Sequence, residues 1–291
     1  MHHMNQVYLV VALVILSQYS LNYLSYYDLM PDILGISLNG ITKNTSYIIP
    51  GTMAILGTLY FESFRDLKRI LYPYLIIPKN PVYWIIACWI MIPTLYVALW
   101  LNDILYGREL ILHVTDWPTW EVIKFNTPLF LNVAISDELF WIGFILPRLL
   151  YCGFSPLKAS LAIGIFWGLD YVPFLWTDFL VSPGLNAPNL ILGWFSLTPI
   201  YVWLYYRTGS AIIVLVFNLF MQFLYTAIPI LPLVTGDNTG AAMANLVCFL
   251  TGLLIWKIAP TTNRTFEPLA HRSLEKANDR LDGETISPKA T

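Results

Sequence analysis

Residues 126–150 read NTPLFLNVAISDELFWIGFILPRLL, an almost uninterrupted apolar stretch. A helix rises about 1.5 Å per residue, so the stretch is long enough to cross the roughly 30 Å hydrocarbon core of a bilayer. Asp137 and Glu138 lie near its middle. A carboxylate at that depth costs at least about 2.5–3.5 kcal/mol, so the pair predicts a functional site inside a membrane helix.

Seven further apolar stretches of similar length surround this one. They are residues 6–26, 46–63, 82–106, 157–176, 189–206, 209–230 and 239–258. The whole chain is 57% hydrophobic and only 12% charged, with a mean hydropathy of +0.62, which excludes an ordinary soluble domain. The sequence therefore predicts an all-α fold, a polytopic membrane helical bundle of about eight transmembrane helices. The first stretch has no small-residue cleavage pattern after it, so we expect a retained helix rather than a signal peptide.

The basic residues predict the orientation of the bundle. With eight crossings, thirteen of the sixteen Lys and Arg residues fall on one side, and only Lys43, Arg108 and Lys124 fall on the other. By the positive-inside rule both termini are then cytoplasmic. Arg148 is assigned to the cytoplasmic loop between the fourth and fifth spans, so no basic side chain is expected inside the bundle.

The chain divides into a membrane part and a tail. Residues 1–258 form the membrane-embedded helical domain, whereas 259–291 are rich in polar residues and are predicted to be a disordered cytoplasmic tail. Residues 64–79 read as a short basic amphipathic helix at the cytoplasmic surface, and 108–125 as an interfacial segment on the far side.

Two other spans carry polar residues to a similar depth. Asp170 lies about thirteen residues into the fifth span, and Asn218 lies about nine residues into the seventh, with Gln222 one helical turn further on the same face. We therefore expect Asp137, Glu138, Asp170 and Asn218 to meet at one interior cavity, and Gln222 is a fifth candidate site residue.

The motifs around these residues resemble those of the CAAX-protease and bacteriocin-processing family of intramembrane endopeptidases, which includes the prenyl-protein CAAX endopeptidase. That family has Glu-Glu-x-x-x-Arg, a Gly-Phe-hydrophobic-Pro-Arg stretch, Phe-x-x-x-His, and Thr-Gly-Ser leading to His-x-x-x-Asn or Asp. The order and spacing match over about 82–230, and Gly143 to Arg148 and Thr208-Gly209-Ser210 match as written. The resemblance implies an eight-helix bundle with a membrane-buried cavity.

The catalytic positions depart from the family pattern. Asp137 stands at the first Glu, and Glu138 matches the second. The other four positions, Arg, His, His and Asn or Asp, hold Ile142, Asp170, Asn218 and Gln222. The chain's four histidines, His2, His3, His113 and His271, all fall outside the predicted spans.

The resemblance implies a hydrolytic mechanism, and the substitutions replace most of the residues on which it depends. In the family a carboxylate and a His activate water, while His and Asn stabilise the oxyanion. Without a cation in the interior, three carboxyls repel one another and lose solvation, so at least one is expected to hold a proton at neutral pH.

Three interpretations follow from this constellation. The first is a proteolytically degenerate member whose cavity binds a lipid, a prenylated or hydrophobic peptide, or a partner helix. The second is an enzyme with altered chemistry, either a hydrolase in which two carboxyls share a proton or an isoprenoid-modifying enzyme that uses a protonated carboxyl. The third is structural, with the carboxyls satisfied by backbone, Asn132, Ser136, Asn218 or Gln222.

Other classes have less support in the sequence. A Mg²⁺ ion held by Asp137, Glu138 and Asp170 would suit the preference of that ion for oxygen ligands, but no cofactor is expected. Nucleic-acid binding is excluded by the net charge of −2 and by basic residues that follow the membrane surface. A proton-coupled transporter is the main alternative of another class, although the two halves show no matching interrupted helices.

Overall fold

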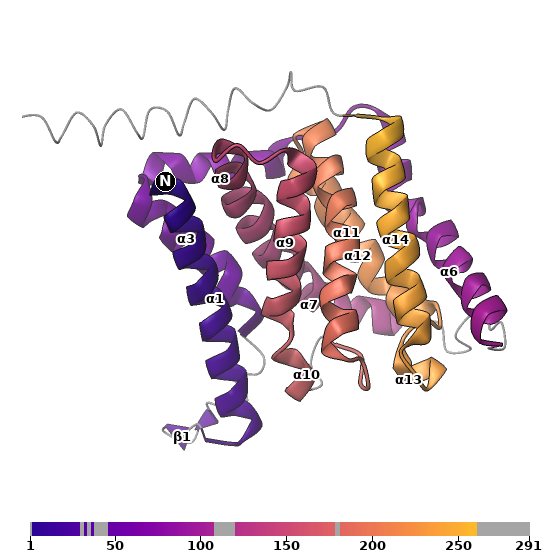
Figure 1. Cartoon of the computed structure of the whole chain (residues 1–291). Coiled ribbons are helices and arrows are strands. Elements are labelled where there is room, and N and C mark those ends of the chain that lie inside the picture. The colour runs from indigo at the N-terminus through magenta and orange to yellow at the C-terminus, as the bar shows by residue number, and fades with distance from the viewer. Residues whose placement is uncertain are drawn as a thin grey trace, which may run out of the picture.

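A computed structural model of the chain describes residues 2–29, 32–33, 36–37, 46–107, 120–177 and 181–260. These residues are helical apart from loops and one two-residue antiparallel pairing, β1 (Asp32–Ile33) with β2 (Ile36–Ser37). The all-α prediction is therefore confirmed. The protein is a polytopic helical bundle of the integral membrane type (Figure 1).

A helix occupies each of the eight predicted spans. In chain order they are α1 (His2–Tyr26), η1 with α3 (Ser46–Ile48, Ile49–Phe61), α5 with α6 (Pro81–Trp89, Met91–Tyr106), α7 with η4 and α8 (Trp120–Glu138, Leu139–Ile145, Leu146–Tyr151), α9 with α10 (Pro156–Tyr171, Phe174–Thr177), α11 (Ala187–Thr208), α12 (Ala211–Ala227) and α14 (Thr239–Ile258). A short α13 (Pro232–Thr235) precedes the last of them. Five of these helices are long and apolar enough to cross a membrane, and two shorter apolar ones cover 46–61 and 211–225.

The N-terminus and the last turn of α14 lie at the same end of the bundle, as an even number of crossings requires (Figure 1). The opposite end carries α10 and α13. The segment from Asn126 to Tyr151 is the centre, because 72% of its apolar window is buried, compared with 33% for α1, α5–α6 and α14. The quoted stretch is thus surrounded by other helices, whereas those three segments present large exposed apolar side chains such as Leu16 and Trp100.

Two glycines let α9 approach α11 closely. A methyl group on Gly164 would lie 2.4 Å from Thr198 Oγ1 and 2.6 Å from Phe195 Cα, and one on Gly168 would lie 2.6 Å from Ile191 Cα. Spaced four residues apart, they form the small-residue stripe that membrane helices use for close contact. This contact holds α9, the helix that carries Asp170 near its end, against α11.

The Thr208-Gly209-Ser210 motif has a local physical reason. Gly209 ends α11 in the left-handed conformation, with φ of +66°, which glycine adopts without a steric penalty. Ser210 then caps α12, its Oγ accepting a hydrogen bond from the backbone N–H of Ile213 at 3.4 Å. The motif therefore sets the start of the helix that carries Asn218.

The central helix widens directly after the two carboxyls. Residues 139–145 form a π-helix, in which the N–H of Leu146 bonds the carbonyl of Trp141 five residues back. Pro147 follows at once; it lacks an N–H and crowds the carbonyl four residues before it, so a regular α-helix is disfavoured here. Such wide turns occur often at functional sites.

One expectation about charge is wrong. Arg148 is completely buried in α8 rather than placed in a surface loop. Its guanidinium pairs with Glu62, which is 2% exposed and also binds Arg69 at 2.8 Å. Arg148 further donates to the Phe144 carbonyl at 2.7 Å and lies 3.5 Å from the centroid of the Phe144 ring. The carboxylate of Glu62, with these hydrogen bonds, is what allows an arginine to be buried here.

The surface segment is helical, but in three pieces rather than one. It consists of η2 (Phe64–Asp66), α4 (Leu67–Leu71) and η3 (Tyr72–Leu75), with Pro73 inside the last. The predictions for residues 108–119 and for the tail from 261 onward lie outside the described residues.

Candidate functional site

The three predicted carboxyls are all buried, with exposed fractions of 0–1%. Asp137 has a strong partner, because the Tyr171 hydroxyl donates a hydrogen bond to its Oδ2 at 2.6 Å. Tyr171 comes from the end of α9, where Pro173 stops the helix and leaves the ring facing α7. This bond joins the two central helices at the depth of the carboxyls.

The other two carboxyls have no such partner. Neither oxygen of Glu138 and neither oxygen of Asp170 has a hydrogen-bond partner among the described residues. Asp137 lies close enough to both for their charges to interact. Buried polar atoms in native proteins are nearly always paired with protein or water, so four unpaired carboxyl oxygens mark this cluster as unusual.

The amides of α12 lie beside Glu138. Gln222 Nε2 donates to Asn218 Oδ1 at 3.5 Å, one turn apart on the same face. Asn218 is 1% exposed, and its Nδ2 has no hydrogen-bond partner in the described part of the chain, although the Glu138 carboxyl is near. All five predicted site residues therefore come from three helices that pack together.

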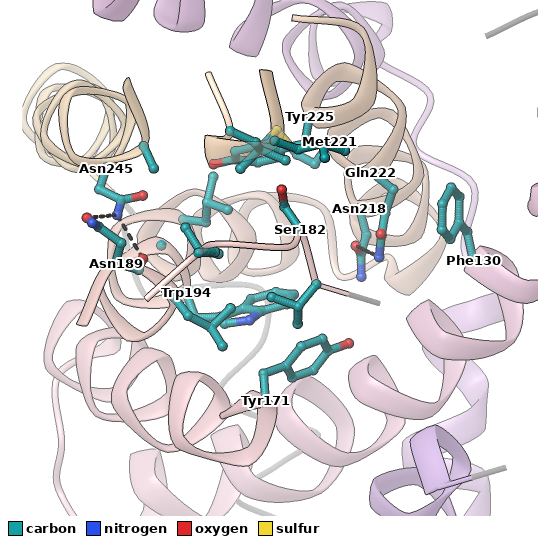
Figure 2. Close-up of a pocket in the computed structure, with 18 of the residues that line it drawn as sticks. Phe130, Tyr171, Ser182, Asn189, Trp194, Asn218, Met221, Gln222, Tyr225 and Asn245 are labelled. Carbon is teal, nitrogen blue, oxygen red and sulfur yellow. Dashed lines mark hydrogen bonds between the residues drawn. The ribbon is translucent and has the colours of Figure 1, made fainter. Parts of the chain in front are cut away.

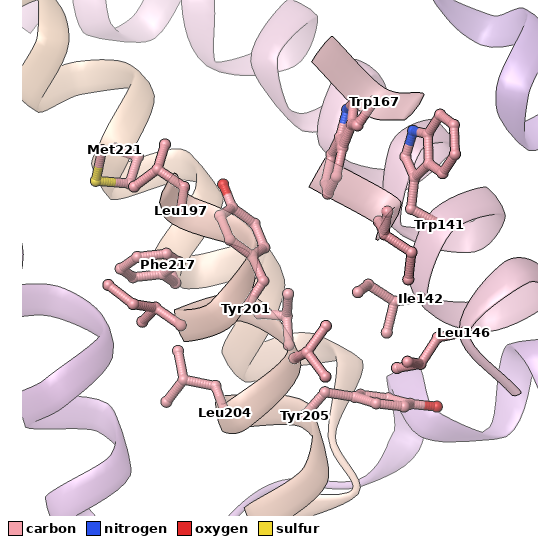
Figure 3. Packing of buried hydrophobic residues seen from close by; sticks show 14 of the residues in the cluster. Trp141, Ile142, Leu146, Trp167, Leu197, Tyr201, Leu204, Tyr205, Phe217 and Met221 are labelled. Carbon is pink, nitrogen blue, oxygen red and sulfur yellow. The ribbon is translucent and has the colours of Figure 1, made fainter. Parts of the chain in front are cut away.

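Aromatic rings from η4, α9 and α11 pack beside this cluster. Trp167 stacks on Trp194 with centroids 4.2 Å apart and on Trp141 at 5.9 Å, and Tyr201 meets the Trp167 ring edge-on at 5.5 Å. Figure 3 shows Trp141, Trp167 and Tyr201 within the buried core. The Nε1 atom of Trp141 has no hydrogen-bond partner among the described residues, and that of Trp167 lies near the Asp137 carboxyl.

A cavity of about 500 Å³ opens next to these rings (Figure 2). Its wall includes Tyr171, Trp194 and Tyr201 together with Asn218 and Gln222. Residues from two connecting segments also line it, which places it toward the end of the bundle that carries α10 and α13: Val181, Ser182, Leu185, Leu231, Leu233 and Val234. This volume lies in the range of pockets that bind small ligands.

The expected convergence on one cavity is only partly correct. Asn218 and Gln222 line the cavity, but Asp137, Glu138 and Asp170 are not among the described residues of its wall. Tyr171 and Asn218 lie between the cavity and the carboxyls. Both border the cavity; Tyr171 donates a hydrogen bond to Asp137, and Asn218 lies beside Glu138. The carboxyls thus form a second layer behind the wall.

Of the side chains named as partners for a structural role, Asn218 lies beside a carboxyl, that of Glu138, whereas Asn132 and Ser136 do not bind one. Asn132 is exposed, and Ser136 accepts a hydrogen bond from the backbone N–H of Gly51 at 2.9 Å rather than binding a carboxyl. For a cation, no group of three His, Cys, Asp or Glu side chains in the described segments is arranged to hold a metal ion. The Mg²⁺ hypothesis therefore gains no geometric support.

Sequence reasoning missed several residues of the cavity wall. Asn126, Asn189 and Asn245 line it, and Trp194 forms its aromatic side. Asn189 and Asn245 fall inside predicted spans, so the rule that flagged Asn218 could have identified them. Nothing in the sequence distinguishes Trp194 from the other ten tryptophans.

Fold and site together define an integral membrane helical bundle with an internal cavity and a buried carboxyl cluster. In a comparison with known families, residues 119–224, about a third of the chain, are similar to the family described as type II CAAX prenyl endopeptidase Rce1-like. The match contains all five predicted site residues, and the resemblance predicted from the motifs is confirmed over this segment. No curated protein matches the chain.

Proposed function

We propose that this protein is a non-proteolytic relative of the CAAX endopeptidases that binds a membrane amphiphile, lipid-like or prenylated, in the cavity beside α11 and α12. The observation that carries the proposal is the separation between cavity and carboxyls. A general base must lie within hydrogen-bond reach of the water that it activates, and here Tyr171 and Asn218 occupy the wall instead.

The residue types agree with this proposal. No described residue of the cavity wall is a histidine, and positions 170 and 218, which hold His in the family, hold Asp and Asn. Neither replacement supplies the positive charge that would stabilise an oxyanion. The wall is otherwise mostly apolar and aromatic, as in pockets for hydrophobic ligands.

The cavity volume favours a chain-like ligand over a partner helix. A helix with side chains is at least about 10 Å wide and rises 5.4 Å per turn, so one turn fills roughly 420 Å³. A volume of about 500 Å³ would hold little more than one such turn. A single hydrocarbon or isoprenoid chain fits better.

Two experiments test the proposal. The purified protein should not cleave a prenylated CAAX peptide, whereas a variant with Asp137→Glu, Asp170→His and Asn218→His restores three family residues and is the positive comparison. Cleavage by the wild-type protein that is lost in Glu138→Gln or Asp137→Asn would contradict the proposal.

Binding is the direct test. Tritiated farnesol, a fifteen-carbon isoprenoid alcohol, should bind saturably to the protein in phosphatidylcholine nanodiscs. Gly193→Leu should block binding, because Gly193 lines the cavity and has room for a first carbon, 3.4 Å from Asn245 Oδ1. Leu192→Trp, on the same helix but 49% exposed, is the matched control and should bind normally.

A second candidate function is an intramembrane hydrolase that uses two carboxyls. The four unpaired oxygens of Glu138 and Asp170 favour it, because a buried carboxyl pair that shares a proton can activate water. The Glu138→Gln cleavage result above decides between the two candidates.

We also propose that both ends of the membrane domain face the cytoplasm. The basic segment of residues 65–69 and the N-terminus lie at the same end of the bundle, which the positive-inside rule assigns to the cytoplasm. A cysteine at position 68 in a cysteine-free background should be labelled by an impermeant maleimide only after the cells are opened.

A further inference from the structure

The cavity wall is rich in amide side chains. Asn126, Asn189, Asn218, Gln222 and Asn245 come from α7, α11, α12 and α14. Four of them form two pairs: Asn245 Nδ2 donates to the Asn189 carbonyl at 2.9 Å, and Gln222 donates to Asn218. Figure 2 shows the two pairs at different sides of the cavity.

The wall carries no charge. None of its residues within the described segments is Lys, Arg, Asp, Glu or His. An anionic headgroup buried here would lose its hydration without meeting a cation, which costs several kcal/mol or forces the group to take up a proton. A cationic headgroup would meet no carboxylate in the wall.

Amide side chains suit uncharged polar headgroups, the class left once anions and cations are disfavoured. Each Asn or Gln offers two N–H donors and one carbonyl acceptor, which suits a hydroxyl, an ester or another amide. Asn218 Nδ2 lies beside the Glu138 carboxyl without a hydrogen bond of normal geometry among the described residues, whereas Gln222 is only partly buried and uses one amide hydrogen on Asn218. Asn245 already uses its amide on Asn189, so the Asn218–Gln222 pair is the one with capacity for a ligand.

We infer that the cavity selects an uncharged amphiphile, with a hydroxyl, ester or amide headgroup at the Asn218–Gln222 pair and a hydrocarbon chain along Leu197, Met221 and Trp194. This inference rests on the proposed function and narrows its ligand class. It also bears on peptides, because a peptide ending in a free carboxylate would bring an anion into an uncharged site.

Three ligands with the same chain test the headgroup. Farnesol, farnesoic acid and farnesene share a fifteen-carbon skeleton and carry a hydroxyl, a carboxyl and no polar group, respectively; farnesene has one further double bond. Each would compete against tritiated farnesol in phosphatidylcholine nanodiscs at pH 9, where the acid is ionised. Farnesol should bind at least tenfold more tightly than farnesoate and more tightly than farnesene.

Variants of Gln222 locate the headgroup. Gln222→Lys should reverse the preference by raising the affinity for farnesoate, whereas Gln222→Glu, of nearly the same size as glutamine, should lower it further. If a variant does not fold, the three-ligand comparison on the wild-type protein still decides.

The outcomes distinguish failure of the headgroup assignment from failure of the proposed function. Farnesoate or farnesene binding to the wild-type protein as tightly as farnesol would overturn the headgroup assignment and leave the proposed function standing. Absence of any saturable binding that Gly193→Leu abolishes would overturn the proposed function, and the headgroup assignment with it.

Discussion

Removal of Arg148 should destabilise the protein more than any surface change. In Arg148→Met the side chain keeps much of its apolar length, but Glu62 loses one of its two partners while remaining 2% exposed. Removing one member of a buried ion pair typically costs about 3–5 kcal/mol. Taking about 2–4 °C per kcal/mol for a chain of this size, the unfolding midpoint should fall by roughly 6–20 °C.

A double-mutant cycle isolates the pair from the packing. Glu62→Leu together with Arg148→Met replaces both charges. The loss of unfolding free energy in the double variant should therefore be smaller than the sum of the two single losses by at least about 1 kcal/mol. Arg207→Met is the matched control: Arg207 is half-buried at the end of α11, and its hydrogen bond to the Pro260 carbonyl is long, at 3.4 Å. It should change the midpoint little.

Thermal unfolding in detergent, followed by the loss of monodisperse protein, measures all four variants. An Arg148→Met protein within about 1 °C of the wild type would refute the reasoning, because a lone Glu62 would then cost nothing. Strictly additive losses in the double variant would assign the effect to packing on the Phe144 ring instead of charge.

Three further changes probe the site and its frame. Asp170→Asn should leave the unfolding midpoint unchanged or raise it, because it removes an unpaired buried carboxyl near Asp137; a fall of several degrees would show that Asp170 is ionised and paired. Tyr171→Phe should destabilise by about 1–3 kcal/mol by leaving Asp137 without its donor, and an unchanged midpoint in chemical or thermal unfolding would show that this bond contributes little. Gly164→Ala should destabilise by about 1–2 kcal/mol net of helix propensity because its methyl meets α11 backbone, while the control Gly143→Ala, whose nearest contact is 3.4 Å, should be neutral or stabilising.

Hydropathy was sufficient to predict the architecture, because spanning a bilayer imposes one requirement on every crossing segment. Each predicted span contains a helix. The same reasoning failed for Arg148, since a basic residue near a span end looks identical whether it reaches the surface or pairs with a distant Glu62. The pairing spans 86 positions in the sequence, and no local pattern encodes it.

The sequence was sufficient to predict which polar residues lie in the interior, but not which of them border the cavity. Intramembrane polarity identified Asp137, Glu138, Asp170, Asn218 and Gln222, and these do lie on adjoining helices. Which of them face the cavity depends on the rotation of each helix, set by contacts such as that of Gly164 with α11. Tyr171 could not be separated from packing aromatics by sequence, because its role depends on a single hydroxyl contact.

The wide turn over residues 139–145 affects how this chain should be aligned with its relatives. In a regular α-helix, deleting one residue rotates everything beyond it by about 100°. A π-turn holds one residue more than an α-turn, so a deletion there would convert it to α-helix and keep Asp137 and Arg148 on their present faces. Relatives can therefore differ by one residue between the carboxyl pair and the Pro-Arg stretch while sharing the same geometry. Ile142, which stands opposite the family's Arg when residues are simply counted, lies inside this turn. The residue of this chain that occupies the place of the family's Arg should be found by superposing the helices on either side of the turn.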